Sequence, residues 1–123
     1  MGDTKNKEQL ISEGKLEIKG DLETEKLVYG KEGIDVGKKL NNSSDLQSEG
    51  NITVSEDTIN TGKILSEKEL NIKGNTVNQG TLYGKENVKL EKNLNNSGSV
   101  QTTGNLSAKD TVNTSKLTSE GNI

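Results

Sequence analysis

The chain has 123 residues, with a hydrophobic content of 26%, an aromatic content of 2%, a net charge of -3 and no cysteine or histidine. This composition suits a single domain at most, and it excludes disulfides, thiolate metal sites and histidine-dependent catalysis. Lysines and acidic residues are interspersed without a run of five like charges, so no nucleic-acid-binding surface is expected. No apolar stretch is long enough to span a membrane, so no membrane span is expected.

In chain order, residues 1–9 are polar and are expected to form a lead before the ordered region. From residue 10 onward, short runs alternate apolar and polar residues, as in LEIK at 16–19 and ITVS at 52–55. Clusters of Asn, Gly, Ser and Asp separate these runs. The alternation predicts half-buried β-strands, and the clusters predict tight turns between them.

An 18-residue repeat organises the apolar residues of the whole ordered region. Other apolar residues follow each repeat's first anchor after two, six or seven, and twelve positions. A strand–turn cycle that closes at a fixed period predicts a solenoid, in which each coil buries its apolar side chains against the next. We therefore expect an all-β, single-stranded parallel β-helix of about six coils. The first anchors of successive coils are Leu16, Ile34, Ile52, Leu70, Val88 and Leu106.

A longer repeat lies above the 18-residue one. Residues 10–63 align without gaps to residues 64–117, so three coils form a unit that occurs twice. The domain organisation is therefore a repeat array over 10–123, made of two 54-residue units and a partial coil. Ile123 is expected to be an anchor of that last coil, and the array has no evident polar cap at either end. We expect an excerpt of a longer array that associates with itself end to end.

The third apolar residue of each coil shifts by one position in some coils, from Leu40 to Ile59 for example. We expect all of these residues to point inward and the next loop to compensate. Asparagine follows directly at five of these positions and is expected to form a hydrogen-bonded amide column along the rod. Small residues two positions after the fourth apolar residue, such as Ser48 and Gly84, are expected to point inward at a corner. The predicted asparagine column is Asn41, Asn60, Asn78, Asn95 and Asn113.

These repeats resemble those of filamentous haemagglutinins, the large two-partner secretion adhesins that include contact-dependent inhibition proteins. The resemblance covers residues 10–123 and is clearest in LNNSGSV at 94–100 followed by GNLSA at 104–108. The first coil departs from the pattern, with Leu22-Glu23-Thr24 at the corner, and Ser44 and Ser115 replace the usual glycine. The resemblance implies a right-handed helix, an outer-membrane secretion partner, and a location that is secreted or on the bacterial cell surface.

The search for chemistry gives no catalytic, cofactor-binding or metal-binding residue. The 19 carboxylates occupy mostly outward or turn positions, so we interpret them as a solvated surface. The Gly-Lys pairs do not complete a phosphate-binding loop. Tyr29 and Tyr83 occupy equivalent positions of the two units and are expected to point outward, either shielding neighbouring coils or stacking on a sugar ring.

Three functions remain in contention. The preferred one is a non-enzymatic stalk segment of a secreted adhesin or toxin-delivery filament involved in cell adhesion and virulence, with any host-cell or bacterial receptor bound through other domains. The alternative is a cytoskeletal β-helix of the bactofilin kind that polymerises with itself. The third is a hexapeptide-repeat acyltransferase, which is disfavoured because that family uses a left-handed helix with one large apolar residue per face and a histidine base.

Overall fold

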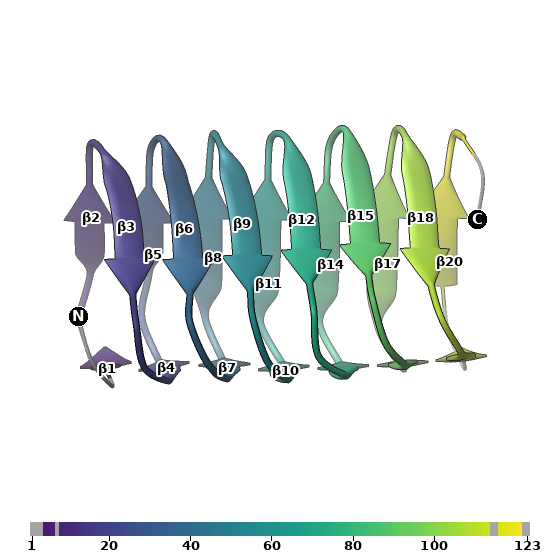
Figure 1. The fold of residues 1–123 in the computed structure, drawn as a ribbon, viewed down its shortest axis with the longest axis horizontal. Helices are drawn as coiled ribbons and strands as arrows, with labels where there is room; N and C mark the ends of the chain where they lie inside the picture. Colours follow the sequence, from purple (N-terminus) through teal and green to yellow (C-terminus); the bar gives the residue numbers. More distant parts are fainter. Residues whose placement is uncertain (1–3, 7, 114–115, 122–123) are drawn as a thin grey trace.

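The structure is a computed structural model that describes residues 4–6, 8–113 and 116–121. Over these ranges every regular element is a short β-strand. The described residues contain no helix that is long and apolar enough to cross a membrane. The strands wind into a rod with three faces (Figure 1). In that view the chain descends along the nearer strands, crosses below and ascends along the more distant ones while advancing from left to right. The winding is therefore right-handed, and the predicted parallel β-solenoid of 18-residue coils is confirmed.

Each face is one parallel sheet, called A, B or C here. Sheet A contains β1 (Thr4–Asn6), β4 (Leu22–Thr24), β7 (Leu40–Asn42), β10 (Thr58–Asn60), β13 (Thr76–Asn78), β16 (Leu94–Asn96) and β19 (Thr111–Asn113). Sheet B contains β2 (Leu10–Ser12), β5 (Val28–Gly30), β8 (Asp45–Ser48), β11 (Lys63–Ser66), β14 (Thr81–Gly84), β17 (Ser99–Thr102) and β20 (Lys116–Ser119). Sheet C contains β3 (Lys15–Ile18), β6 (Gly33–Val36), β9 (Asn51–Val54), β12 (Glu69–Ile72), β15 (Asn87–Leu90) and β18 (Asn105–Ala108).

The register between coils is 18 residues through almost the whole rod. Ile34 pairs with Ile52 in sheet C, and Ile64 pairs with Leu82 in sheet B. Only the last coil is one residue shorter, since Val100 pairs with Leu117. Constant register keeps like residues stacked, so every inward position becomes a continuous column along the rod.

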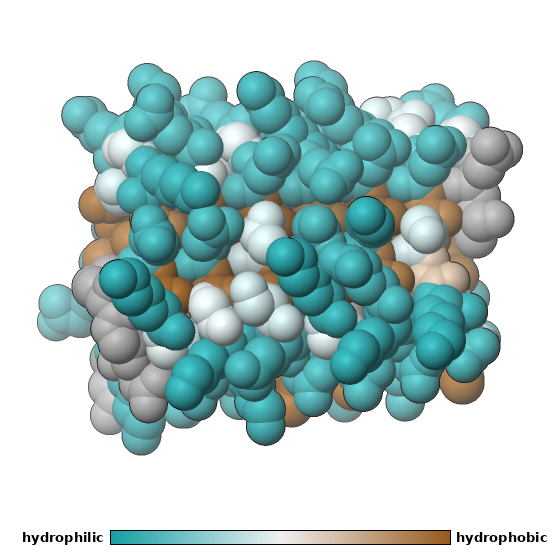
Figure 2. Space-filling model, viewed as in Figure 1, coloured by the Kyte–Doolittle hydropathy of each residue, from teal (hydrophilic) through white to brown (hydrophobic). Residues whose placement is uncertain are grey.

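Side chains that point inward from the three sheets form one continuous apolar core. The six first anchors, Leu16, Ile34, Ile52, Leu70, Val88 and Leu106, all belong to it and are at most 6% exposed. A coil contributes so few side chains that burial is complete only through contact with the coils on either side. This explains how a chain with little apolar content folds. Figure 2 shows that the face over sheet C is covered mainly by hydrophilic residues.

The structure differs from the sequence-based expectation at the short strands of sheet A. Ile59 is 47% exposed and Val112 is 61% exposed, whereas Thr58 and Thr76 are buried at the positions that Leu40 and Leu94 occupy in their coils. The inward position of these strands therefore does not shift by one residue, although the apolar residue does. The strand keeps its register and places threonine inside and the β-branched apolar residue outside, because a one-residue shift would turn every side chain of the strand over.

The stacked strands extend closer to the N-terminus than the sequence pattern indicates. The segment predicted as a polar lead contains β1, which pairs with β4 through Thr4 and Leu22, so the stacked strands begin before residue 10. At the other end, the expected anchor Ile123 lies outside the described residues.

Candidate functional site

A ladder of hydrogen-bonded asparagines lies inside the rod, at the corner between sheets A and B. Nδ2 of Asn42 donates to Oδ1 of Asn60 at 2.9 Å, and each later asparagine donates to the next at 2.8 Å. The first four members are 0% exposed. The members of this asparagine ladder are Asn42, Asn60, Asn78, Asn96 and Asn113.

The first four ladder amides also donate to a backbone carbonyl of their own corner. Nδ2 of Asn60 donates to the carbonyl of Gly62, two residues on, at 3.1 Å, and to the carbonyl of Thr81 in the next coil at 2.9 Å. Buried amides are costly unless their hydrogen-bonding groups have partners. In this ladder the partners are supplied by the backbone of two coils, so the amides fix the turn and the spacing of coils together.

This geometry corrects the predicted asparagine column at two positions. Asn41 and Asn95 are exposed in the middle of β7 and β16, and the ladder uses Asn42 and Asn96 instead. Asn60, Asn78 and Asn113 lie where they were expected. The physical reason is strand register. Because Asn42 pairs with Asn60 across the sheet, the neighbouring coil selects the second asparagine of each Asn-Asn pair.

The predicted small-residue column lies inside the corner between sheets B and C. Ser48 is buried, and its Oγ donates to the carbonyl of Gly30 at 2.6 Å and accepts from the backbone N–H of Gly50 at 3.0 Å. A Cβ on Gly30 would lie 2.6 Å from the carbonyl oxygen of Gly33. Only small side chains fit here because the chain reverses direction against its own backbone.

Sequence reasoning missed a second set of side chains, which cap the turns from outside. Oδ1 of Asp57 accepts the backbone N–H of Asn75 at 2.7 Å, and Oδ1 of Asn75 accepts that of Asn93 at 3.2 Å. Asn87 caps Asn105 in the same way at 2.9 Å. Each contact joins residues 18 positions apart. The available signal was the recurrence of Asp or Asn at two fixed positions of successive coils. One position is the turn before sheet A, at Asp57, Asn75 and Asn93, and the other is the start of the strands of sheet C, at Asn87 and Asn105.

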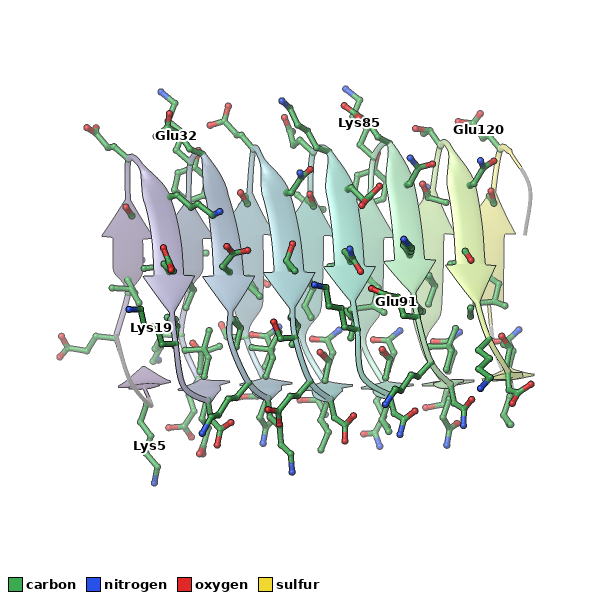
Figure 3. The ribbon with its side chains drawn as sticks, viewed as in Figure 1. Lys5, Lys19, Glu32, Lys85, Glu91 and Glu120 are labelled. Carbon is green, nitrogen blue, oxygen red and sulfur yellow. The ribbon has the colours of Figure 1, made fainter. Side chains whose placement is uncertain are left out.

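Charged side chains cover the turns and the outer faces. Glu32, Lys85 and Glu120 project from the turns that follow sheet B (Figure 3). Lys15 Nζ lies 2.8 Å from a carboxylate oxygen of Asp35, and this hydrogen-bonded ion pair raises the pKa of Lys15. Among the described residues, no group of three or more carboxylates lies close enough to hold a metal ion.

The two tyrosines lie on the outer face of sheet B and are partly exposed. The hydroxyl of Tyr29 donates to Oε2 of Glu49, and this hydrogen bond raises the pKa of Tyr29. Desolvation and the negative charges of Glu49 and Glu67 act in the same direction. Tyr29 therefore stays protonated in the folded state to a higher pH than a free tyrosine.

A groove of about 280 Å³ lies over sheet A, and its lining includes Leu22, Leu40 and Ile59 together with Asp21 and Asp57. Leu22 and Leu40 are core residues that are 1% exposed. Core side chains therefore form part of the lining of the groove, beside the exposed side chain of Ile59.

Comparison of the chain with protein-family models, with curated proteins and with solved structures gives no match.

Proposed function

We propose that this chain is a structural stalk segment of a secreted bacterial surface adhesin or toxin-delivery protein, with no catalytic role. The observation that carries the proposal is the constancy of the cross-section. Sheets, register and the asparagine ladder repeat from coil to coil, so further coils add length and nothing else. A rod built this way holds whatever lies beyond it at a fixed distance, about 4.8 Å farther for each coil.

The adhesin identity rests on the resemblance of the repeats to filamentous haemagglutinins. The right-handed winding agrees with that resemblance and disfavours the hexapeptide-repeat acyltransferases, whose helix is left-handed. The proposal includes export through an outer-membrane secretion partner, a cell-surface location, and receptor binding by other domains of the parent protein.

Protease shaving of intact source cells, followed by mass spectrometry, tests this proposal. We expect peptides from residues 10–113 to be released from intact cells while cytoplasmic control proteins stay protected. Recovery of these peptides only after lysis would contradict the export of the chain and so refute the adhesin stalk.

The second candidate is a bactofilin-like cytoskeletal polymer. It is favoured by the constant 18-residue register of the parallel sheets, since bactofilins are also β-helices with coils of similar length. Under this alternative the purified chain forms filaments that lengthen with concentration, which electron microscopy would show, and the peptides appear only after lysis.

A further inference from the structure

We propose that the outer face of sheet B pairs two copies of this chain side by side, with their rods antiparallel. The proposal goes beyond the stalk function and does not depend on it. It concerns five neighbouring strands, β2, β5, β8, β11 and β14, whose outward side chains form an apolar column bordered by a column of charges.

The apolar column is formed by the outward side chain near the middle of each strand. Cα pairing places these residues side by side in the order Ile11, Tyr29, Gln47, Leu65 and Tyr83. Ile11 is 58% exposed, and the other four are partly exposed. Four of the five are apolar or aromatic on a chain whose outer faces are otherwise mainly polar. An exposed stripe rich in apolar side chains, interrupted only by Gln47, marks an interaction surface.

The charged column lies two residues further along each strand, in the turn toward sheet C. All of its residues are exposed. The turns stack like the strands, since the backbone N–H of Lys31 donates to Ser12 and that of Lys85 donates to Ser66. In the same coil order as the apolar column, the charged column is Glu13, Lys31, Glu49, Glu67 and Lys85.

Each of the two columns is complementary to the same column of a second copy whose coils run in the opposite order. A two-fold axis that runs along β8 keeps each position along the strand and reverses the order of the coils. It places Ile11 opposite Tyr83 of the second copy, and Tyr29 opposite Leu65. In the charged column the same axis places Glu13 opposite Lys85 of the second copy, and Lys31 opposite Glu67. Apolar residues thus face apolar residues, opposite charges face each other, and every contact occurs twice.

The residues on the axis meet themselves. Gln47 faces Gln47 of the second copy, where two amides can exchange hydrogen bonds. Glu49 faces Glu49 of the second copy, and Asp45, the exposed first residue of β8, faces Asp45 of the second copy. Both contacts are repulsive. Exposed charge pairs contribute little each, and the four attractive pairs outnumber these two repulsive ones.

The contact area sets the expected strength. Five strands span about 24 Å along the rod, and four residues span about 13 Å across it, which gives roughly 300 Å² per copy. Stable interfaces bury about 1,200 Å² or more in total. A single pair of these chains is therefore a weak dimer that forms at high protein concentration.

Sedimentation equilibrium of the purified chain tests the pairing through charge reversal. One variant carries Lys31→Glu and Lys85→Glu, and the other carries Glu13→Lys and Glu67→Lys. In each variant alone all four pairs become repulsive, so we expect self-association to weaken about tenfold. In an equimolar mixture of the two variants all four pairs are restored, and we expect association to return to the level of the unaltered chain. The control with the same charge change is Lys73→Glu with Lys89→Glu, two exposed lysines away from sheet B, which should leave association unchanged.

Two further measurements bear on the same proposal. Tyr29→Ser with Tyr83→Ser should abolish the dimer while the β-sheet circular dichroism spectrum persists. Glu49→Gln should strengthen the dimer by removing one of the two repulsive contacts on the axis. The proposal is overturned if the unaltered chain stays monomeric at high concentration. It is also overturned if the mixture fails to regain association, or if an open series of ever larger species shows that contact is end to end.

Discussion

At the scale of single residues, hydrogen bonding decides which polar side chains the interior accepts. The asparagine ladder brings a buried amide into every coil from Asn42 to Asn96, and each amide finds carbonyl partners and a neighbouring amide. The hydroxyls of Thr58 and Thr76 are equally buried but have no hydrogen-bond partner among the described residues. These two kinds of buried polar group therefore have opposite effects on stability.

The ladder is tested by two adjacent residues of the same type. Asn42→Ala removes donors from Asn60, from Ser44 and from Lys63, and it leaves a small cavity. We expect it to lower the free energy of unfolding by about 3 kcal/mol. Asn41→Ala, at the exposed position that the sequence pattern favoured, should change it by less than about 0.5 kcal/mol. Urea denaturation measures both, and equal effects would contradict the register described here.

Replacing the two threonines without a hydrogen-bond partner should change the free energy of unfolding in the opposite direction. Valine has nearly the shape of threonine without the hydroxyl, so Thr58→Val and Thr76→Val should each raise the free energy of unfolding by about 1 kcal/mol. Thr24→Val is the matched control, because the buried hydroxyl of Thr24 donates to the carbonyl of Lys26 at 2.7 Å. It should destabilise the rod. Thermal unfolding of the three variants gives the signs, and stabilisation by Thr24→Val would refute the assignment.

At the scale of strands and turns, the alternation of apolar and polar residues predicted the strands, and the 18-residue spacing of their anchors predicted the β-solenoid. The alternation was not sufficient in the three-residue strands of sheet A, where Thr-Ile-Asn at 58–60 and Thr-Val-Asn at 76–78 place the apolar residue outside. Hydropathy alone favours isoleucine inside. The inner positions are fixed instead by pairing with neighbouring strands and by the ladder amides, and these contacts join coils 18 residues apart.

The close stacking of turns leaves no room for a side chain at Gly80. A Cβ on Gly80 would lie 1.9 Å from the carbonyl oxygen of Gly62 in the coil below, so Gly80→Ala forces stacked turns apart. We expect a loss of about 3 kcal/mol in the free energy of unfolding. Gly14→Ala is the control, since its Cβ would meet only the flexible carboxylate of Glu32 at 3.4 Å. It should be close to neutral. Equal melting temperatures for the two variants would contradict the close stacking of these turns.

At the scale of the whole molecule, the rod is a one-dimensional array in which each coil contacts mainly the next. The free energy of unfolding of the rod is then a sum of terms for the coils and for the interfaces between neighbouring coils. The sequence predicted this modular design from its 18-residue period. The pairing face could not be predicted in the same way, because its columns exist only once the register places residues 18 apart side by side.

Modularity predicts that one whole coil can be excised. Deleting residues 55–72 joins Val54 to Lys73, and since Val54 is the equivalent of Ile72 in the coil below, sheets, turns and ladder continue across the joint. We expect a folded rod that is about 4.8 Å shorter and melts cooperatively at a somewhat lower temperature. Deleting only residues 55–63 joins β9 to the interior of β11 and removes a strand from sheet A, which leaves the adjacent coils without partners. That half-coil variant should fail to fold. Circular dichroism and small-angle scattering distinguish the two, and equal behaviour would mean that the 18-residue coil is not the unit on which the rod is built.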